Sequence, residues 1–107
     1  EVYEGDSFRR DMSYHQGITW PWLLGLYYNS LKNMIKNSKN KKQKVELEEK
    51  LEKFRAQIYK TFKNELNDNG CIGSIAELYD SVKPNLPKGA IAQGWSVAEV
   101  FRIILGK

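Results

Sequence analysis

The sequence has little cysteine and histidine, with one of each among its 107 residues. Cys71 has no second cysteine to pair with, which excludes an internal disulfide and favours a reducing, cytoplasmic setting. His15 belongs to no cluster of cysteine, histidine or acidic residues with metal-ligand spacing. A glycine-rich phosphate-binding loop is also missing. The sequence therefore predicts neither a metal site nor a cofactor.

Long apolar runs are missing as well. The longest apolar stretch is far shorter than the ~20 residues that a membrane-spanning helix needs. The N-terminus does not have the pattern of a signal peptide, and we expect no membrane partner. The chain begins at Glu1 rather than at methionine, which suggests an excised fragment of a longer protein.

The excess of basic residues is local. The net charge is +4, but five lysines lie within residues 36–44, and without them basic and acidic residues nearly balance. A nucleic-acid-binding face usually mixes such lysines with arginines and aromatic residues. This polar, turn-like run is more typical of a solvated loop between two helices. We therefore expect no nucleic-acid partner.

Apolar periodicity predicts two long helices on either side of that loop. The first runs from about residue 21 to 36, opens on Pro21, and is apolar on nearly all sides, as in a helix buried within a larger protein. The second runs from about residue 44 to 66 with one apolar stripe, and Asn69–Gly70 is expected to end it.

A third helix is predicted near the C-terminus. Ser96 and Glu99 have the spacing of a capping box, which would start the helix at Ser96, and Gly106 would end it. Residues 1–12 read as irregular, and no strand pattern is convincing. The predicted fold class is all-α, with about three main helices and long ordered loops.

One acidic residue stands in a stretch without helical or strand period. Glu77 lies within Gly73–Asp80, between the turn cluster 67–70 and the proline-containing segment 83–89. A carboxylate on a loop braced by helices suits a general base. Most acidic residues have structural roles instead, such as helix capping or ion pairing, so Glu77 by itself does not decide the function.

Aromatic and planar polar side chains crowd residues 13–22. Such groups line carbohydrate sites, where rings pack on sugar C–H groups and polar groups hold hydroxyls. An aromatic plug in a hydrophobic core is an equally weighted alternative. The side chains concerned are Tyr14, His15, Gln16, Trp20 and Trp22.

Three segments form a larger pattern. They are residues 10–17 continued by 20–25, then Gly73–Asp80, then Pro87–Val100. In this order and spacing they resemble the C-terminal glucosidase region of glycogen debranching enzymes, the amylo-α-1,6-glucosidase family. The resemblance covers most of the chain except the lysine-rich run and the second helix. It implies that residues 1–107 are the C-terminal part of an (α/α)6 toroid, with no complete second domain.

The same resemblance implies an enzyme that hydrolyses α-1,6 branch linkages in glycogen or another branched α-glucan. The distantly related glucoamylases carry a Gly-Ser-x-x-Glu segment whose glutamate is the general base, and this match puts that role on Glu77. The general acid is expected upstream of residue 1, with Asp11 and Asp80 as lower-ranking candidates. The isolated chain should then be inactive without the rest of its parent enzyme.

The resemblance also implies where the sugar binds. His15, Gln16, Trp20 and Trp22 would lie beside the sugar subsite, and Trp95 would lie near the pocket floor. A few positions, such as Lys88 and Gly94, depart from the family pattern and affect sugar contacts more than the base.

A helical protein-interaction module without enzymatic activity is the alternative function. The apolar first helix would then mark a partner surface. Self-association of the chain through this helix would fit either hypothesis, because a piece of a barrel also exposes surface meant for its neighbours.

Overall fold

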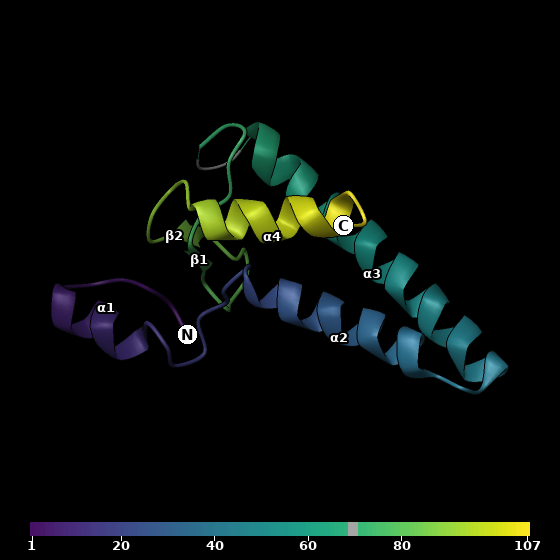
Figure 1. Cartoon of the computed structure of the whole chain (residues 1–107). Helices are drawn as coiled ribbons and strands as arrows, with labels where there is room; N and C mark the ends of the chain where they lie inside the picture. Colours follow the sequence, from purple (N-terminus) through teal and green to yellow (C-terminus); the bar gives the residue numbers. More distant parts are fainter. Residues whose placement is uncertain (69–70) are drawn as a thin grey trace.

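The computed structural model describes residues 1–68 and 71–107, and in these residues it is mostly helical. The elements are α1 (Ser7–Ser13), α2 (Leu23–Asn37), α3 (Lys41–Asp68), β1 (Leu78–Tyr79), β2 (Pro87–Lys88) and α4 (Gly94–Ile104). Figure 1 shows α2, α3 and α4 packed against one another, while the short helix α1 stands apart beside the N-terminus. This confirms the predicted all-α class.

The two long helices form where the apolar pattern predicts them. Helix α2 begins two residues after Pro21, because Pro21 and Trp22 form a turn in which Leu24 N–H donates to Pro21 O at 3.0 Å. The predicted stop of α3 at Asn69–Gly70 lies outside the described residues. None of the described helices combines the length and the apolar content that crossing a membrane requires.

The lysine-rich run is only partly a loop, which corrects the prediction. Residues 38–40 alone connect the two helices, and Lys41, Lys42 and Lys44 already belong to α3. Helix α3 starts earlier than its apolar stripe because Asn40 caps it, with the Asn40 side chain accepting a hydrogen bond from Gln43 N–H at 3.2 Å. These lysines are nevertheless exposed, as expected.

The N-terminal segment contains a helix that the prediction of irregular structure missed. The Asp6 carboxylate accepts the N–H of Arg9 at 2.9 Å and caps α1. Helix α1 packs against no other element of the described chain. Its apolar residues Phe8 and Met12 are 72% and 60% exposed.

The predicted capping box of the last helix is wrong. Helix α4 begins at Gly94, and Ser96 is completely buried within it. The Ser96 hydroxyl donates to Gln93 Oε1 at 2.7 Å, while Glu99 pairs with Arg102 at 2.6 Å instead of reaching back. The helix starts earlier because Gln93 is fixed by a 3.0 Å bond from its N–H to Ile75 O.

A short sheet also contradicts the expectation that no strand forms. Strands β1 and β2 pair antiparallel, with Leu78 opposite Lys88. Thr19 adds a third, isolated partner, since Thr19 N–H donates to Tyr79 O at 3.0 Å and Tyr79 N–H donates to Thr19 O at 2.8 Å. Strands of two residues are too short for a period of two to be visible in the sequence.

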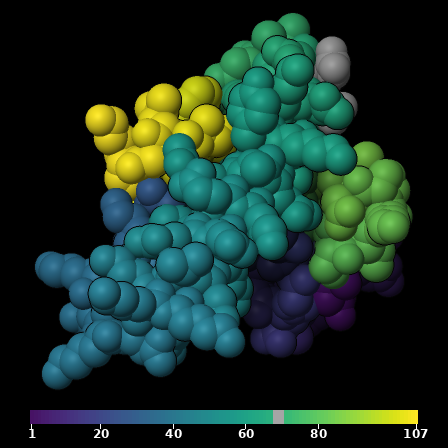
Figure 2. All heavy atoms as spheres, turned by 90° about the vertical axis from the view of Figure 1, so that its right-hand side faces the viewer, coloured from purple at the N-terminus to yellow at the C-terminus, as the bar shows by residue number. Residues whose placement is uncertain are grey.

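The core forms where residues 73–80, the central stretch of the chain, meet the packed helices α2, α3 and α4. Burial of the apolar side chains of this core is the main stabilising contribution to the fold. Figure 2 shows α3 lying across one face, with the end of α4 on one side and the segment after β1 on the other. The buried cluster consists of Tyr28, Ile58, Phe62, Ile75, Ala76, Tyr79, Val100 and Ile103.

Candidate active site

Glu77 lies immediately before β1 and extends the pairing with the segment after β2. Its backbone N–H donates to Ala90 O at 2.9 Å, and its side-chain Oε2 accepts the N–H of Ala90 at 3.0 Å. Its other oxygen, Oε1, accepts a hydrogen bond from the Tyr14 hydroxyl. Each oxygen of the half-buried carboxylate therefore has one protein donor.

The sheet explains why residues far apart in sequence meet at Glu77. The Thr19–Tyr79 bridge places residues 13–22, the aromatic segment, beside β1, with Tyr79 two residues from Glu77 along the chain. The Trp20 indole N–H donates to Tyr14 O at 3.0 Å, which closes this segment into a compact turn. The two segments are thus joined by backbone bonds as well as by the contact of Tyr14 with Glu77.

Three rings form an aromatic cluster next to the carboxylate. The Tyr14 ring meets the rings of His15 and Trp20 edge to face, with centroids 4.7 and 4.6 Å apart. The rings of His15 and Trp20 stack nearly parallel, with their planes 9° apart and their centroids 5.4 Å apart. His15 is exposed to solvent.

The hydrogen bond to Glu77 raises the pKa of Tyr14 to about 12, with burial and the charge of Glu77 as smaller causes. The phenol therefore stays protonated at neutral pH and acts as a donor. A carboxylate has about four lone-pair sites, and the two donors leave the remaining sites free to accept a proton or a hydrogen bond. This arrangement suits a base.

The comparison with protein families identifies the chain. The family model for amylo-alpha-1,6-glucosidase matches residues 1–102. The chain belongs to this family. Searches of curated proteins and of solved structures gave no match. The amylo-alpha-1,6-glucosidases are glycoside hydrolases, which makes an α-glucan the implied substrate.

A second aromatic pair in this amylo-alpha-1,6-glucosidase chain joins the start of α2 to α4. Trp22 and Trp95 stack with ring centroids 4.3 Å apart and planes 18° from parallel. Trp95 is 56% exposed, and its expected place near the pocket floor stays a prediction. The stacked pair is therefore partly open to solvent.

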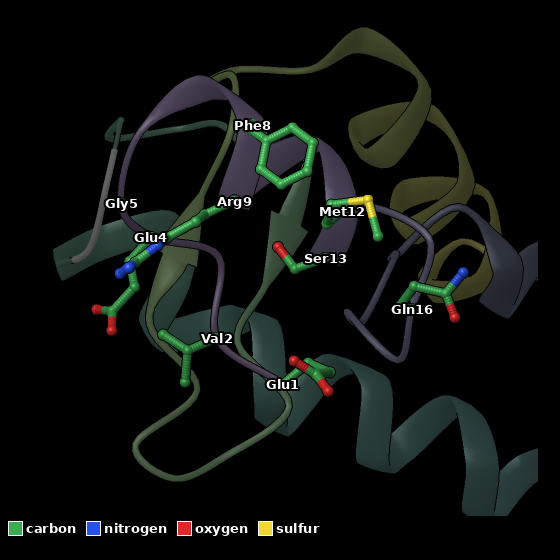
Figure 3. A pocket seen from close by; sticks show the side chains of 9 residues that line it. All are labelled: Glu1, Val2, Glu4, Gly5, Phe8, Arg9, Met12, Ser13 and Gln16. Carbon is green, nitrogen blue, oxygen red and sulfur yellow. The ribbon is translucent and has the colours of Figure 1, made fainter.

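Gln16 lines a hollow of the surface to which Glu77 does not contribute. Figure 3 shows this hollow, of about 620 Å³, with Phe8 and Met12 of α1 on its wall. All its lining residues come from the first 16 of the chain, and Glu77 is not among them. The structure therefore brings Tyr14, His15 and Trp20 together with Glu77 but does not bring Gln16 to that carboxylate.

The two lower-ranking acids have different surroundings. Asp80 is 3% exposed, accepts the N–H of Tyr3 at 2.8 Å, and lies 3.8 Å from Lys88 Nζ. These contacts tie the N-terminal segment to the sheet. Asp11 is exposed on α1, and it forms no ion pair with another described residue.

Sequence reasoning missed the groups that contact Glu77. Tyr14 belongs to the motif but received no separate role, and the Gly89–Ala90 peptide received none. The sequence hints at these contacts only through Gly89, because a glycine can adopt a positive φ and leaves room for a neighbouring side chain. No group of three or more metal-binding side chains occurs in residues 1–68 and 71–107.

Proposed function

We propose that this chain carries the general base of a debranching glucosidase, and that Glu77 is this base. The enzyme would hydrolyse α-1,6 branch linkages in glycogen or a similar branched α-glucan. One observation supports the proposal above all: the Glu77 carboxylate lies against Tyr14, within the aromatic cluster that includes His15 and Trp20. Aromatic rings beside a carboxylate are the usual lining of a sugar site.

The proposed reaction is hydrolysis with inversion. Glu77 takes a proton from a water molecule while the water oxygen attacks the anomeric carbon. The glycosidic C–O bond breaks, and the leaving oxygen takes a proton from a general acid. The two carboxyl groups of such enzymes stand ~6.5–9.5 Å apart, which leaves room for the water. We assign the acid to a part of the toroid outside this sequence.

The aromatic surfaces would bind the sugar rings. The stacked pair of Trp22 and Trp95 offers an exposed indole face of the kind that packs on sugar C–H groups. His15, which lies in the aromatic cluster beside Glu77, would hold hydroxyl groups. The chain would be the C-terminal part of an (α/α)6 toroid, acting in the cytoplasm and completed by the rest of its parent enzyme.

Replacing Glu77 by glutamine in the full-length protein tests the proposal. Loss of a general base lowers kcat by ~10²–10⁴-fold, because the neutral amide cannot accept the proton of the water. The measurement is the release of glucose from α-1,6 branches, with Glu48→Gln on the exposed side of α3 as the matched control. Activity retained in Glu77→Gln would remove Glu77 from the mechanism.

A second measurement examines the stereochemistry. Inversion releases glucose from an α-linkage as the β-anomer, and NMR spectroscopy can identify the anomer before mutarotation. Initial release of the α-anomer would indicate a retaining mechanism and contradict the proposal.

The alternative of an interaction module places its partner surface on α2, where the apolar residues Leu26 and Met34 are 55% and 50% exposed. Phe8 and Met12 on the isolated α1 are exposed as well. A junction with the rest of a toroid would expose the same kind of surface. Self-association of the chain, measured by sedimentation, is therefore compatible with both functions, whereas the loss of activity in Glu77→Gln is expected only for the enzyme.

A further inference from the structure

We propose that Tyr14 and Gly89 are positioning residues for Glu77, and that they fix the direction in which its carboxylate accepts a proton. This inference rests on the proposed function of Glu77 as the general base. Neither residue needs to contact the substrate for this role. Tyr14 holds one carboxylate oxygen, and Gly89 makes room for the other to reach the backbone.

Tyr14 can hold the carboxylate because its own ring is held on several sides. Tyr3, His15 and Trp20 all contact it, with the Tyr3 centroid at 5.7 Å. Its carbonyl oxygen accepts the indole N–H of Trp20 at 3.0 Å. The hydroxyl that donates to Glu77 Oε1 therefore comes from a restrained ring, and little conformational entropy is lost when the hydrogen bond forms.

Gly89 contributes through the side chain that it lacks. Its φ is +69°, in the left-handed region that favours glycine, and a Cβ atom added there would lie 2.5 Å from Glu77 Oε2 and 3.2 Å from Glu77 Cβ. The carboxylate oxygen occupies this space when it accepts the N–H of Ala90 at 3.0 Å. Any larger residue at this position would push the carboxylate away.

Two donors on different oxygens restrict the rotation of the carboxylate plane. The free lone pair that remains on each oxygen is then held in a fixed orientation, which is what a base needs to meet a water molecule at a fixed place. Displacement of a catalytic group by about 1 Å can cost on the order of 100-fold in rate. Loss of either contact should therefore lower kcat more than it weakens substrate binding.

The test compares matched variants of the full-length enzyme in the hydrolysis of a branched α-glucan. Tyr14→Phe removes only the hydroxyl, and Tyr3→Phe is its control, because the neighbouring ring makes no bond to Glu77. Gly89→Ala adds the obstructing Cβ. Gly73→Ala is its control, since Gly73 has a similar φ of +77° but nothing within 4 Å of the added Cβ.

We expect Tyr14→Phe and Gly89→Ala each to lower kcat on the order of 100-fold with KM little changed. Tyr3→Phe and Gly73→Ala should retain normal kcat, and equal melting temperatures within each pair would show that folding is not the cause. Adding Tyr14→Phe to Glu77→Gln should cause little further loss, because residues that act as a unit are not additive.

Two outcomes would overturn the inference. If Glu77→Gln is inactive while Tyr14→Phe and Gly89→Ala behave like their controls, the positioning role is wrong and the proposed function stands. If Glu77→Gln remains active, the base assignment and the positioning role both fail.

Discussion

Tyr79 and Glu65 form a buried pair between β1 and α3. The Tyr79 hydroxyl donates to Glu65 Oε1 at 2.7 Å, and the two residues are 9% and 8% exposed. Burial, and next the hydrogen bond to Glu65, raise the pKa of Tyr79 above its ordinary value near 10. The folded chain therefore binds this phenolic proton more tightly than the unfolded chain does.

The pair predicts a loss of stability in alkaline solution. Because the pKa of Tyr79 is higher in the folded state, its contribution is complete below about pH 10 and falls as the pH rises towards the folded-state pKa. Tyr79→Phe should lower the free energy of unfolding by about 1–3 kcal/mol at neutral pH, since Glu65 stays buried without its donor. The variant should also lose less stability above pH 10 than the parent chain.

Urea unfolding at neutral and alkaline pH measures both effects. Tyr59→Phe is the control, because Tyr59 is 53% exposed. Equal stability of the two variants at both pH values would contradict the assigned role of the pair.

Single residues could be predicted only where a local pattern marks them. Glu77 was found through its motif, and the structure shows that this side chain faces the aromatic segment. Tyr14 lies 63 residues from Glu77 in sequence, and Glu65 lies 14 residues from Tyr79. No spacing rule links such partners, because their contact depends on the arrangement of the short sheet and α3.

At the scale of elements, Arg55 joins two helices. Its Nε and Nη2 atoms donate to Ile103 O at 3.0 Å and to Ile104 O at 2.9 Å. These carbonyls belong to the last turn of α4, whose carbonyl groups lack partners within the helix. A positive charge from α3 thus satisfies the C-terminal end of α4, where the helix dipole is negative.

Replacing Arg55 by lysine should weaken this junction. A lysine ammonium cannot reproduce the planar fork that bonds both carbonyls, and hydrogen bonds to charged groups contribute about 1.5–3 kcal/mol each. We expect a loss of about 1–2 kcal/mol in the free energy of unfolding, because lysine can still reach one carbonyl. Arg10→Lys on the exposed α1 is the control, and equal melting temperatures of the two variants would contradict the prediction.

Helix periods were predicted more reliably than helix ends. The stripe of α3 lies on the core, as shown by the burial of Ile58 and Phe62. The start of α4 was misplaced because Ser96 fits the capping pattern but is needed as a small buried residue. Helix α1 was missed because it is short, and the Asp6 cap was its only local signal.

For the whole molecule, the central stretch is the part on which the three packed helices converge. Ile75 is fully buried and belongs to a cluster with residues of α2, α3 and α4. Two residues later Glu77 leaves the core, so the same short stretch supplies both core side chains and the candidate base. Stability and site geometry therefore depend on the same segment.

Ile75→Ala should destabilise the whole chain. Truncation of a buried isoleucine costs about 2–5 kcal/mol, a large part of the 5–15 kcal/mol that stabilises a typical domain. Ile72→Ala is a close control, because Ile72 lies three residues earlier and is 79% exposed. Thermal unfolding followed by circular dichroism measures the melting temperature of both variants. An equally small decrease in the melting temperature of the two variants would contradict the placement of Ile75 in the core.

The helical class could be predicted from sequence because apolar periodicity is local. The meeting of residues 13–22 with residues 73–80 was implied only by the family resemblance, because no local pattern reveals the backbone bridge at Thr19 and the Tyr14–Glu77 hydrogen bond that join them. The expected (α/α)6 toroid stays a prediction, because residues 1–107 would supply only a part of its helices.

The molecule is elongated, with a longest dimension of 52 Å. The short connection of residues 38–40 lies at one end of it, far from the sheet (Figure 1). It joins two helices whose ends there carry exposed, charged side chains. Extending a surface connection adds only slowly to the entropy of closing it. This tip is therefore a natural place to splice in a fluorescent reporter or an affinity handle without disturbing the carboxylate.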